Sequence, residues 1–124
     1  MKKTIALSAA VLLLAGCGSK VTCTSKDERN GMTDERKIVA TFKGDNLKKE
    51  KITETVTYKD KDDAKTSCES AKKYFKEEKN VTVKCSGKKV IVKGSETRTK
   101  EEMKETKVTK EDFKKQYGDS YKCK

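Results

Sequence analysis

The chain of 124 residues contains no histidine and no tryptophan, and phenylalanine and tyrosine together number only seven. Without histidine it lacks the commonest general base and the commonest metal ligand of proteins. It also has no G-x-S-x-G, H-E-x-x-H or phosphate-loop motif. Adjacent carboxylates such as Asp62-Asp63 and Glu77-Glu78 are typical of a solvated surface in so lysine-rich a sequence. We therefore expect a protein that is not an enzyme and that holds neither a cofactor nor a metal.

The N-terminus has the pattern of a secretion signal. Lys2 and Lys3 precede an apolar run over residues 5–15, and Gly16 and Cys17 follow it. The run of 11 residues is too short for a membrane span, which needs about 20. The alternative to a lipoprotein signal is a plain secretory signal with an incidental cysteine.

A lipobox closes this signal, formed by Leu14, Ala15, Gly16 and Cys17. In such a motif the peptidase cuts before a cysteine that already carries diacylglycerol. We therefore expect residues 1–16 to be a cleaved signal peptide. Cys17 would then hold residues 17–124 on the extracytoplasmic face of the cell membrane, with the lipid bilayer as its partner.

The basic balance has to be interpreted with this export in mind. The net charge is +11, or +9 once Lys2 and Lys3 are removed, and only Arg29, Arg36 and Arg98 are arginines. Nucleic acid is not the expected partner, because the protein is exported and bidentate recognition prefers arginine. Anionic lipid headgroups and wall polymers such as teichoic acids fit better, since each lysine near such a surface adds about 1 kcal/mol of attraction. The alternative is a lysine-rich surface that only keeps a small protein soluble.

Residues 17–124 are enough for a single small domain. With 32% apolar and 41% charged residues, its core should be thin and should need reinforcement. Period-2 patterns predict strands over 21–25, 35–43 and 47–59, with a loop over 26–34 centred on the hairpin signal Asn30-Gly31. Glu54 falls on the inward side of the third strand, which requires either a bulge or a partly wet face.

The pattern then changes to a helical period. Asp60 is a helix cap and Asn80 the expected end, and the apolar face of this helix is formed by Ala64, Cys68, Ala71 and Phe75. Strands follow at 81–85 and 88–93, broken by Gly94-Ser95. Residues 96–108 fit either a continued strand or a helical turn, and a short helix from Lys110 to Tyr117 starts at a capping box. The sequence thus predicts an α+β fold. Its antiparallel sheet of about five strands would comprise a three-strand meander and a hairpin, with one main amphipathic helix packed on it and a short C-terminal helix.

Four cysteines remain besides Cys17, and an even number in a small exported domain predicts disulfides. Cys23 and Cys85 fall on the apolar sides of their strands and Cys68 on the apolar helix face, so we expect these three in one core. Of the three possible pairings we favour Cys68–Cys85 with Cys23–Cys123, although the spacing alone does not decide between them. Structural zinc and thiol redox chemistry both favour a C-x-x-C pair, which is absent, and reduced thiols are a further alternative.

Two stretches carry a family resemblance: Thr-Phe-Lys-Gly-Asp-Asn-Leu at 41–47, and the threonine-rich strand from Ile52 to Tyr58. Together with the lipobox cysteine and the order of elements, this pattern resembles the YehR-like family of small bacterial lipoproteins. The four further cysteines depart from that family's pattern. The resemblance implies an α+β fold and membrane anchoring, and it brings no established activity.

These observations favour a non-catalytic binding or structural module at the cell envelope, with a basic surface for anionic envelope components. The alternative is a disulfide-stabilised inhibitor or interaction partner of an envelope or wall-hydrolase protein.

Overall fold

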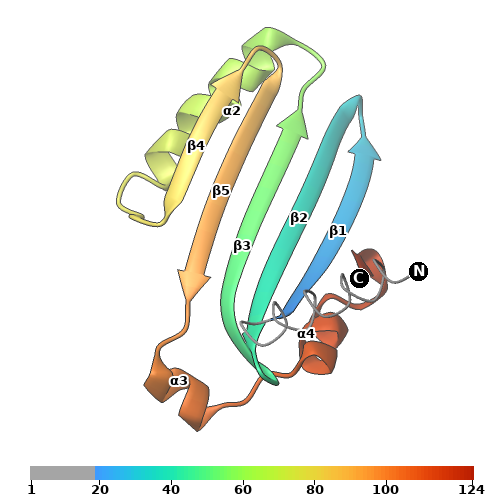
Figure 1. Ribbon diagram of the computed structural model, residues 1–124. Coiled ribbons are helices and arrows are strands. Elements are labelled where there is room, and N and C mark those ends of the chain that lie inside the picture. The colour runs from blue at the N-terminus through green and yellow to red at the C-terminus, as the bar shows by residue number, and fades with distance from the viewer. Residues whose placement is uncertain (1–18) are drawn as a thin grey trace, which may run out of the picture.

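The computed structural model describes residues 19–124, so the signal peptide and Cys17 lie outside the described residues. Within them the fold is α+β, with three α-helices and a six-stranded antiparallel sheet in the order β4-β5-β3-β2-β1-β6 (Figure 1). The elements are β1 (Ser19–Arg29), β2 (Met32–Lys43), β3 (Asn46–Thr57), α2 (Lys61–Tyr74), β4 (Val81–Ser86), β5 (Lys89–Thr97), α3 (Lys100–Glu105), α4 (Lys110–Tyr117), the 3-10 turn η1 (Gly118–Ser120) and β6 (Lys122–Cys123).

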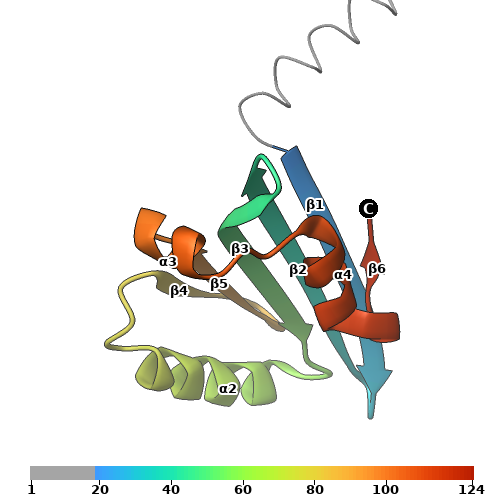
Figure 2. The same cartoon turned by 90° about the horizontal axis from the view of Figure 1, so that it is seen from below.

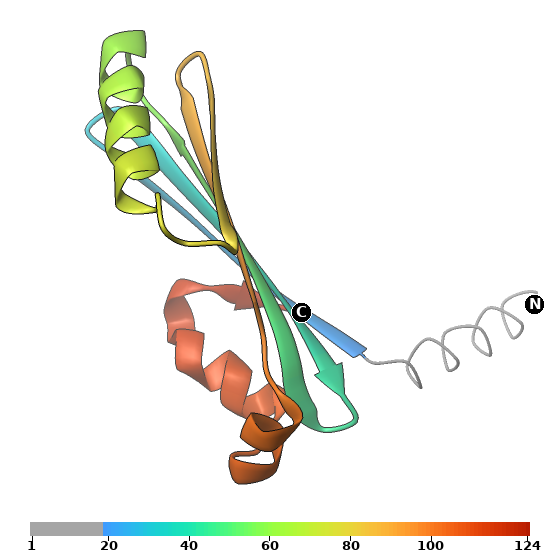
Figure 3. The same ribbon diagram turned by 90° about the vertical axis from the view of Figure 1, so that its left-hand side faces the viewer.

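All three helices lie on the same side of the sheet (Figure 3). Helix α2 contacts β4 and β5, α3 contacts β3, and α4 contacts β1. Helices α2 and α4 are two separate elements on that side (Figure 2). We call this side the helix face, and the opposite side, which no helix of residues 19–124 covers, the open face.

The first hairpin confirms the Asn-Gly signal. Asn30 and Gly31 have φ of 50° and 81°, as a tight two-residue turn between antiparallel strands requires. The strands pair without interruption from Ser19 opposite Phe42 to Arg29 opposite Met32, so the expected loop over 26–34 was wrong. A two-residue turn brings the backbones into register directly at the turn, and the charged side chains there stay exposed.

Helix α2 begins as expected, because the side chain of Asp60 accepts a hydrogen bond from the Asp63 amide at 2.9 Å. Ala64 and Cys68 are buried and Ala71 is partly buried, as the predicted apolar face requires, whereas Phe75 lies after the helix as its C-cap. The helix ends at Tyr74 and not at Asn80, because the chain turns at Phe75 to reach the sheet again at β4.

Strand β5 continues through Gly94 to Thr97, so the expected break at Gly94-Ser95 was wrong. Gly94 lies opposite Ile52 on one side and Val81 on the other, and a Cβ added to it would lie 3.6 Å from Val81 Cγ2. That distance is an ordinary van der Waals contact, and pairing with β3 from Gly94 to Thr97 holds the strand extended.

The ambiguous stretch over 96–108 comprises the end of β5, then α3 behind a capping box at Thr99. The Arg98 guanidinium fixes this stretch, donating to the Leu47 carbonyl at 2.9 Å and to the Thr106 carbonyl at 2.6 Å. Helix α4 spans the predicted residues behind a capping box at Thr109. The tail then adds β6, so the sheet has six strands where about five were expected.

Two separate patches of apolar side chains lie between the sheet and its helices. The larger lies under α4, where Phe113 is fully buried; its other buried members are Val21, Cys23, Ile38, Ala40, Phe42 and Leu47. The smaller lies under α2 and contains Ala64, Cys68 and Val90. The expectation that Cys23, Cys68 and Cys85 share one core was therefore wrong.

Candidate anion-binding face

Both favoured disulfide pairs are present, Cys23–Cys123 and Cys68–Cys85. The first joins β1 to β6, where the two cysteines lie directly opposite each other. The second joins α2 to the edge strand β4. The disulfides thus attach the two edge strands of the sheet, β6 to β1 and β4 to helix α2. They support the rigidity of the sheet between them.

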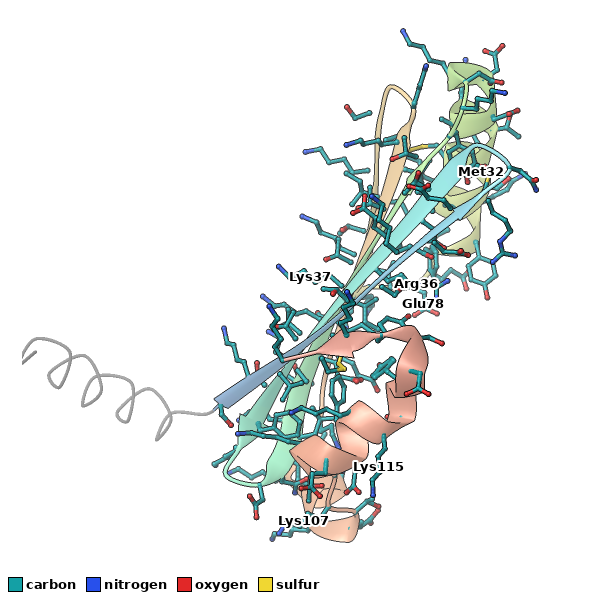
Figure 4. The ribbon with its side chains drawn as sticks, turned by 90° about the vertical axis from the view of Figure 1, so that its right-hand side faces the viewer. Met32, Arg36, Lys37, Glu78, Lys107 and Lys115 are labelled. Carbon is teal, nitrogen blue, oxygen red and sulfur yellow. A yellow bond between two sulfur atoms is a disulfide. The ribbon has the colours of Figure 1, made fainter. Side chains whose placement is uncertain are left out.

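The basic residues gather on the open face. Successive side chains along a strand point to opposite faces of the sheet. The strand register therefore places the residues that alternate with the buried core residues on the open face. Figure 4 shows Lys37 pointing away from the helices. Besides Lys43, which lies at the turn after β2, the side chains that share its side include nine lysines, which we call the open-face lysines: Lys20, Lys26, Lys37, Lys49, Lys51, Lys84, Lys89, Lys93 and Lys122.

The central row across this face alternates lysine and threonine on successive strands. The register aligns, from β6 to β4, Lys122, Thr24, Lys37, Thr53, Lys93 and Thr82. Neighbouring strands lie about 4.8 Å apart, so the lysines of this row stand roughly 10 Å from one another, with a threonine hydroxyl between them. This row presents regularly spaced cations and hydrogen-bond donors to the solvent.

The charge of the open face is strongly unbalanced. Against the nine open-face lysines, the strand residues of this face include only two acids, Glu28 and Glu35, which leaves an excess of seven positive charges. Within residues 19–124, the only ion pair that involves an open-face lysine is Lys26 with Glu28, at 3.8 Å. The remaining eight ammonium groups are thus available to an external anion.

A shallow hollow of about 760 Å³ lies over the middle of this face, with Lys37, Thr53, Lys89 and Lys122 among its lining residues. Its other polar groups are four hydroxyls, the cations Lys26 and Arg36, and the carboxylates Glu35 and Asp119. Among residues 19–124 there is no cluster of three or more cysteine, aspartate or glutamate side chains arranged to hold a metal ion. The chemistry that this surface offers is electrostatic attraction and hydrogen-bond donation to anions.

The helix face is different in character. Between α2 and α4 the Arg36 Nε donates to Glu54 Oε2 at 2.8 Å, and both residues lie opposite each other in register (Figure 4 labels Arg36). Burial and the neighbouring Glu54 raise the pKa of Asp34, while hydrogen bonds to Tyr121 and Glu54 raise the pKa of Arg36. The inward position of Glu54 is thus explained by a partly wet face. The strand irregularity lies elsewhere, between Thr41 and Phe42.

A second polar pair, partly buried, lies on the helix face beside α4. The Tyr117 hydroxyl donates to Glu50 Oε1 at 3.5 Å. Burial, with Glu96 nearby, raises the pKa of Glu50, and burial together with Glu50 raises the pKa of Tyr117 to about 12. Tyr117 and Glu50 are thus paired with one another on the helix face, as Arg36 and Glu54 are.

Sequence reasoning predicted a basic surface but not its location. The signal was present in the outward threonines Thr22, Thr24, Thr53, Thr55 and Thr57, because their faces also carry lysines at alternate positions. The lipobox residues Leu14, Ala15, Gly16 and Cys17 lie outside the described residues. Among the helices of residues 19–124, none combines the length and the hydropathy that a membrane span requires.

Compared with protein-family models, with curated proteins and with solved structures, the chain shows no match to any of them. The resemblance to YehR-like lipoproteins therefore stays a prediction, and the function is argued from the surface alone.

Proposed function

We propose that this protein is a membrane-anchored bacterial lipoprotein whose folded domain is a non-catalytic binding module for anionic components of the cell envelope. The observation that carries the proposal is the open face, with its nine open-face lysines and two glutamates on a sheet side that none of the described helices covers. The lipobox at Cys17 supports the location, and the resemblance to the YehR-like family agrees with it.

The solubility role of a lysine-rich surface accounts for this arrangement less well. A surface that serves solubility mixes both signs of charge, whereas here the open-face lysines exceed the acids of their face by seven, and those acids lie at one end of β1 and β2. Lysines that face water in a row are also costly through mutual repulsion, and a bound anion would relieve that cost. We therefore favour a binding role.

An inhibitor of a wall hydrolase is the second candidate, and the disulfide-braced fold is compatible with it. Lysozyme-type targets are themselves basic, so this domain would be repelled by them. The two candidates differ in salt dependence. Binding to an anionic polymer or lipid weakens steeply with salt, whereas an inhibitor causes stoichiometric, salt-insensitive loss of hydrolase activity.

The test uses the lipoprotein purified in a neutral detergent and immobilised poly(glycerol phosphate) or phosphatidylglycerol as the anion. The open-face triple variant replaces Lys37, Lys51 and Lys93 by Gln. The helix-side triple variant replaces Lys65, Lys76 and Lys79 by Gln, and therefore changes the net charge equally at exposed positions.

At about 1 kcal/mol for each lysine, the open-face triple variant should bind roughly a hundredfold more weakly than the unmodified protein. The helix-side triple variant should lose only a few-fold, through the general change in net charge. Equal losses in the two variants would show that net charge, and not the open face, determines binding.

A further inference from the structure

We propose that the open face lies flat against an anionic lipid bilayer, with strand β1 parallel to the membrane surface. This inference rests on the proposed function, because it needs both the anchor at Cys17 and anion binding by the open face. It goes further in naming the bilayer as the partner and in fixing the orientation of the domain.

The anchor holds one end of the sheet close to the membrane. Only Gly18 separates Cys17 from Ser19, the first residue of β1. Two residues of extended chain span at most about 7 Å. The Ser19 end of the sheet would therefore stay within about one Debye length of the headgroups, which is about 8 Å at physiological salt.

The positions of the lysines then decide between an upright and a flat orientation. Lys20 lies at the anchored end, and Lys49 belongs to the same cross-strand row through Thr41. Lys26 and Lys89 lie about 20–30 Å further along the strands, at about 3.3 Å per residue. In an upright domain only the first pair would be attracted to the bilayer.

A flat orientation brings all nine open-face lysines within range of the headgroups. Each contributes roughly a fivefold increase in affinity for an anionic surface. The flexible four-carbon stem of lysine lets the ammonium groups reach a plane even though the sheet is twisted. The flat orientation is therefore strongly favoured over the upright one.

The two-dimensional spread of charge favours a bilayer over a polymer chain. The open-face lysines come from all six strands, whereas one linear polymer would follow a single track across them. The only apolar side chains on this side are Val39 and Ile91, so contact would be with headgroups and not with acyl chains. Lysine also suits mobile headgroups, because it acts as a point charge without a fixed bidentate geometry.

The test measures the accessibility of each lysine in the lipoprotein reconstituted into vesicles. The vesicles contain either phosphatidylcholine alone or phosphatidylcholine mixed with phosphatidylglycerol. A membrane-impermeant amine-reactive reagent labels the outside, and peptide mass spectrometry reports labelling at Lys20, at Lys89 and at the helix-side control Lys65. A third sample adds soluble poly(glycerol phosphate) to the neutral vesicles.

We expect labelling of both Lys20 and Lys89 to fall about fivefold in the anionic vesicles and to recover at high salt, with Lys65 unchanged. Protection confined to Lys20 would overturn the flat orientation. Protection by poly(glycerol phosphate) but not by anionic vesicles would overturn this inference and leave the proposed function standing. Protection in neither sample would overturn both.

Discussion

The two disulfides should contribute unequally to stability, and the order can be worked out from the chain. Cys23 and Cys123 are 100 residues apart, whereas Cys68 and Cys85 are 17 apart. In the chain-entropy model the longer loop stabilises by about 4.7 kcal/mol and the shorter by about 3 kcal/mol. The shorter loop is nested within the longer one, which changes the first figure by only about 0.2 kcal/mol.

The paired variants Cys23→Ala with Cys123→Ala, and Cys68→Ala with Cys85→Ala, test this order. Alanine avoids placing a hydroxyl at Cys23, which is fully buried in the larger apolar patch. The cavity left there adds to the cost of the first pair, so packing and chain entropy act in the same direction. Loss of Cys23–Cys123 should therefore destabilise more, by at least about 1.5 kcal/mol.

Urea unfolding followed by far-ultraviolet circular dichroism provides the assay. A difference of about 1.5 kcal/mol separates the midpoints by roughly 1 M for a domain of this size. Reductant should lower the urea midpoint of the wild-type protein to nearly that of a variant in which all four cysteines are replaced by alanine. An equal or larger cost for the Cys68–Cys85 pair would refute the reasoning. If the first pair leaves no folded protein, the second pair still supplies the comparison.

The other expected outcomes concern the apolar patch under α4 and the partly buried carboxyl of Glu50 beside it. Phe113→Ala should lower the free energy of unfolding by about 3–5 kcal/mol in thermal unfolding, because Phe113 is fully buried against Phe42. The control Tyr74→Ala, at a side chain that is 81% exposed, should lower it little. Similar losses in the two variants would contradict the assigned packing. Burial raises the pKa of Glu50 in the folded protein above its ordinary value of 4.5, so the folded state binds the proton more tightly and stability should fall as pH rises from 4.5 through the raised pKa. Glu50→Gln should flatten that part of the stability–pH curve, measured by urea unfolding at each pH. Glu77→Gln, at an exposed position, should leave the curve unchanged. An unaltered curve in Glu50→Gln would exclude the Glu50 carboxyl as the cause.

Local chemistry made much of the fold predictable from sequence. Asp60 and the spacing of Ala64 and Cys68 define α2, because capping and the helical period act within a few residues. Asn30-Gly31 defines the first hairpin for the same reason. Two of the missed features depend on distant partners. Strand β6 has only two residues and no period of its own, and it forms where Cys123 meets Cys23. The continuation of β5 past Gly94 depends on its pairing with β3.

For the candidate site too, the local features could be predicted from the sequence, and those that depend on distant partners could not. The excess of lysine was evident in the composition, but its concentration on one face depends on register. Lys37 and Lys93 share a row only because Thr53 of β3 lies between them. The division of the core into two patches was also hidden, since it depends on which helix covers which strands. Pairings over such separations are set by tertiary packing, for which a single sequence has no local signal.

The most direct test of the central claim is the salt dependence of binding to poly(glycerol phosphate) or phosphatidylglycerol. The logarithm of the binding constant should fall linearly with the logarithm of the salt concentration, with a slope set by the number of lysines that contact the anion. In the open-face triple variant, which lacks Lys37, Lys51 and Lys93, the account predicts that the slope shrinks by about two to three units. In the helix-side triple variant the slope should remain that of the wild type. A wild-type slope in the open-face triple variant would contradict the claim that this face binds anions.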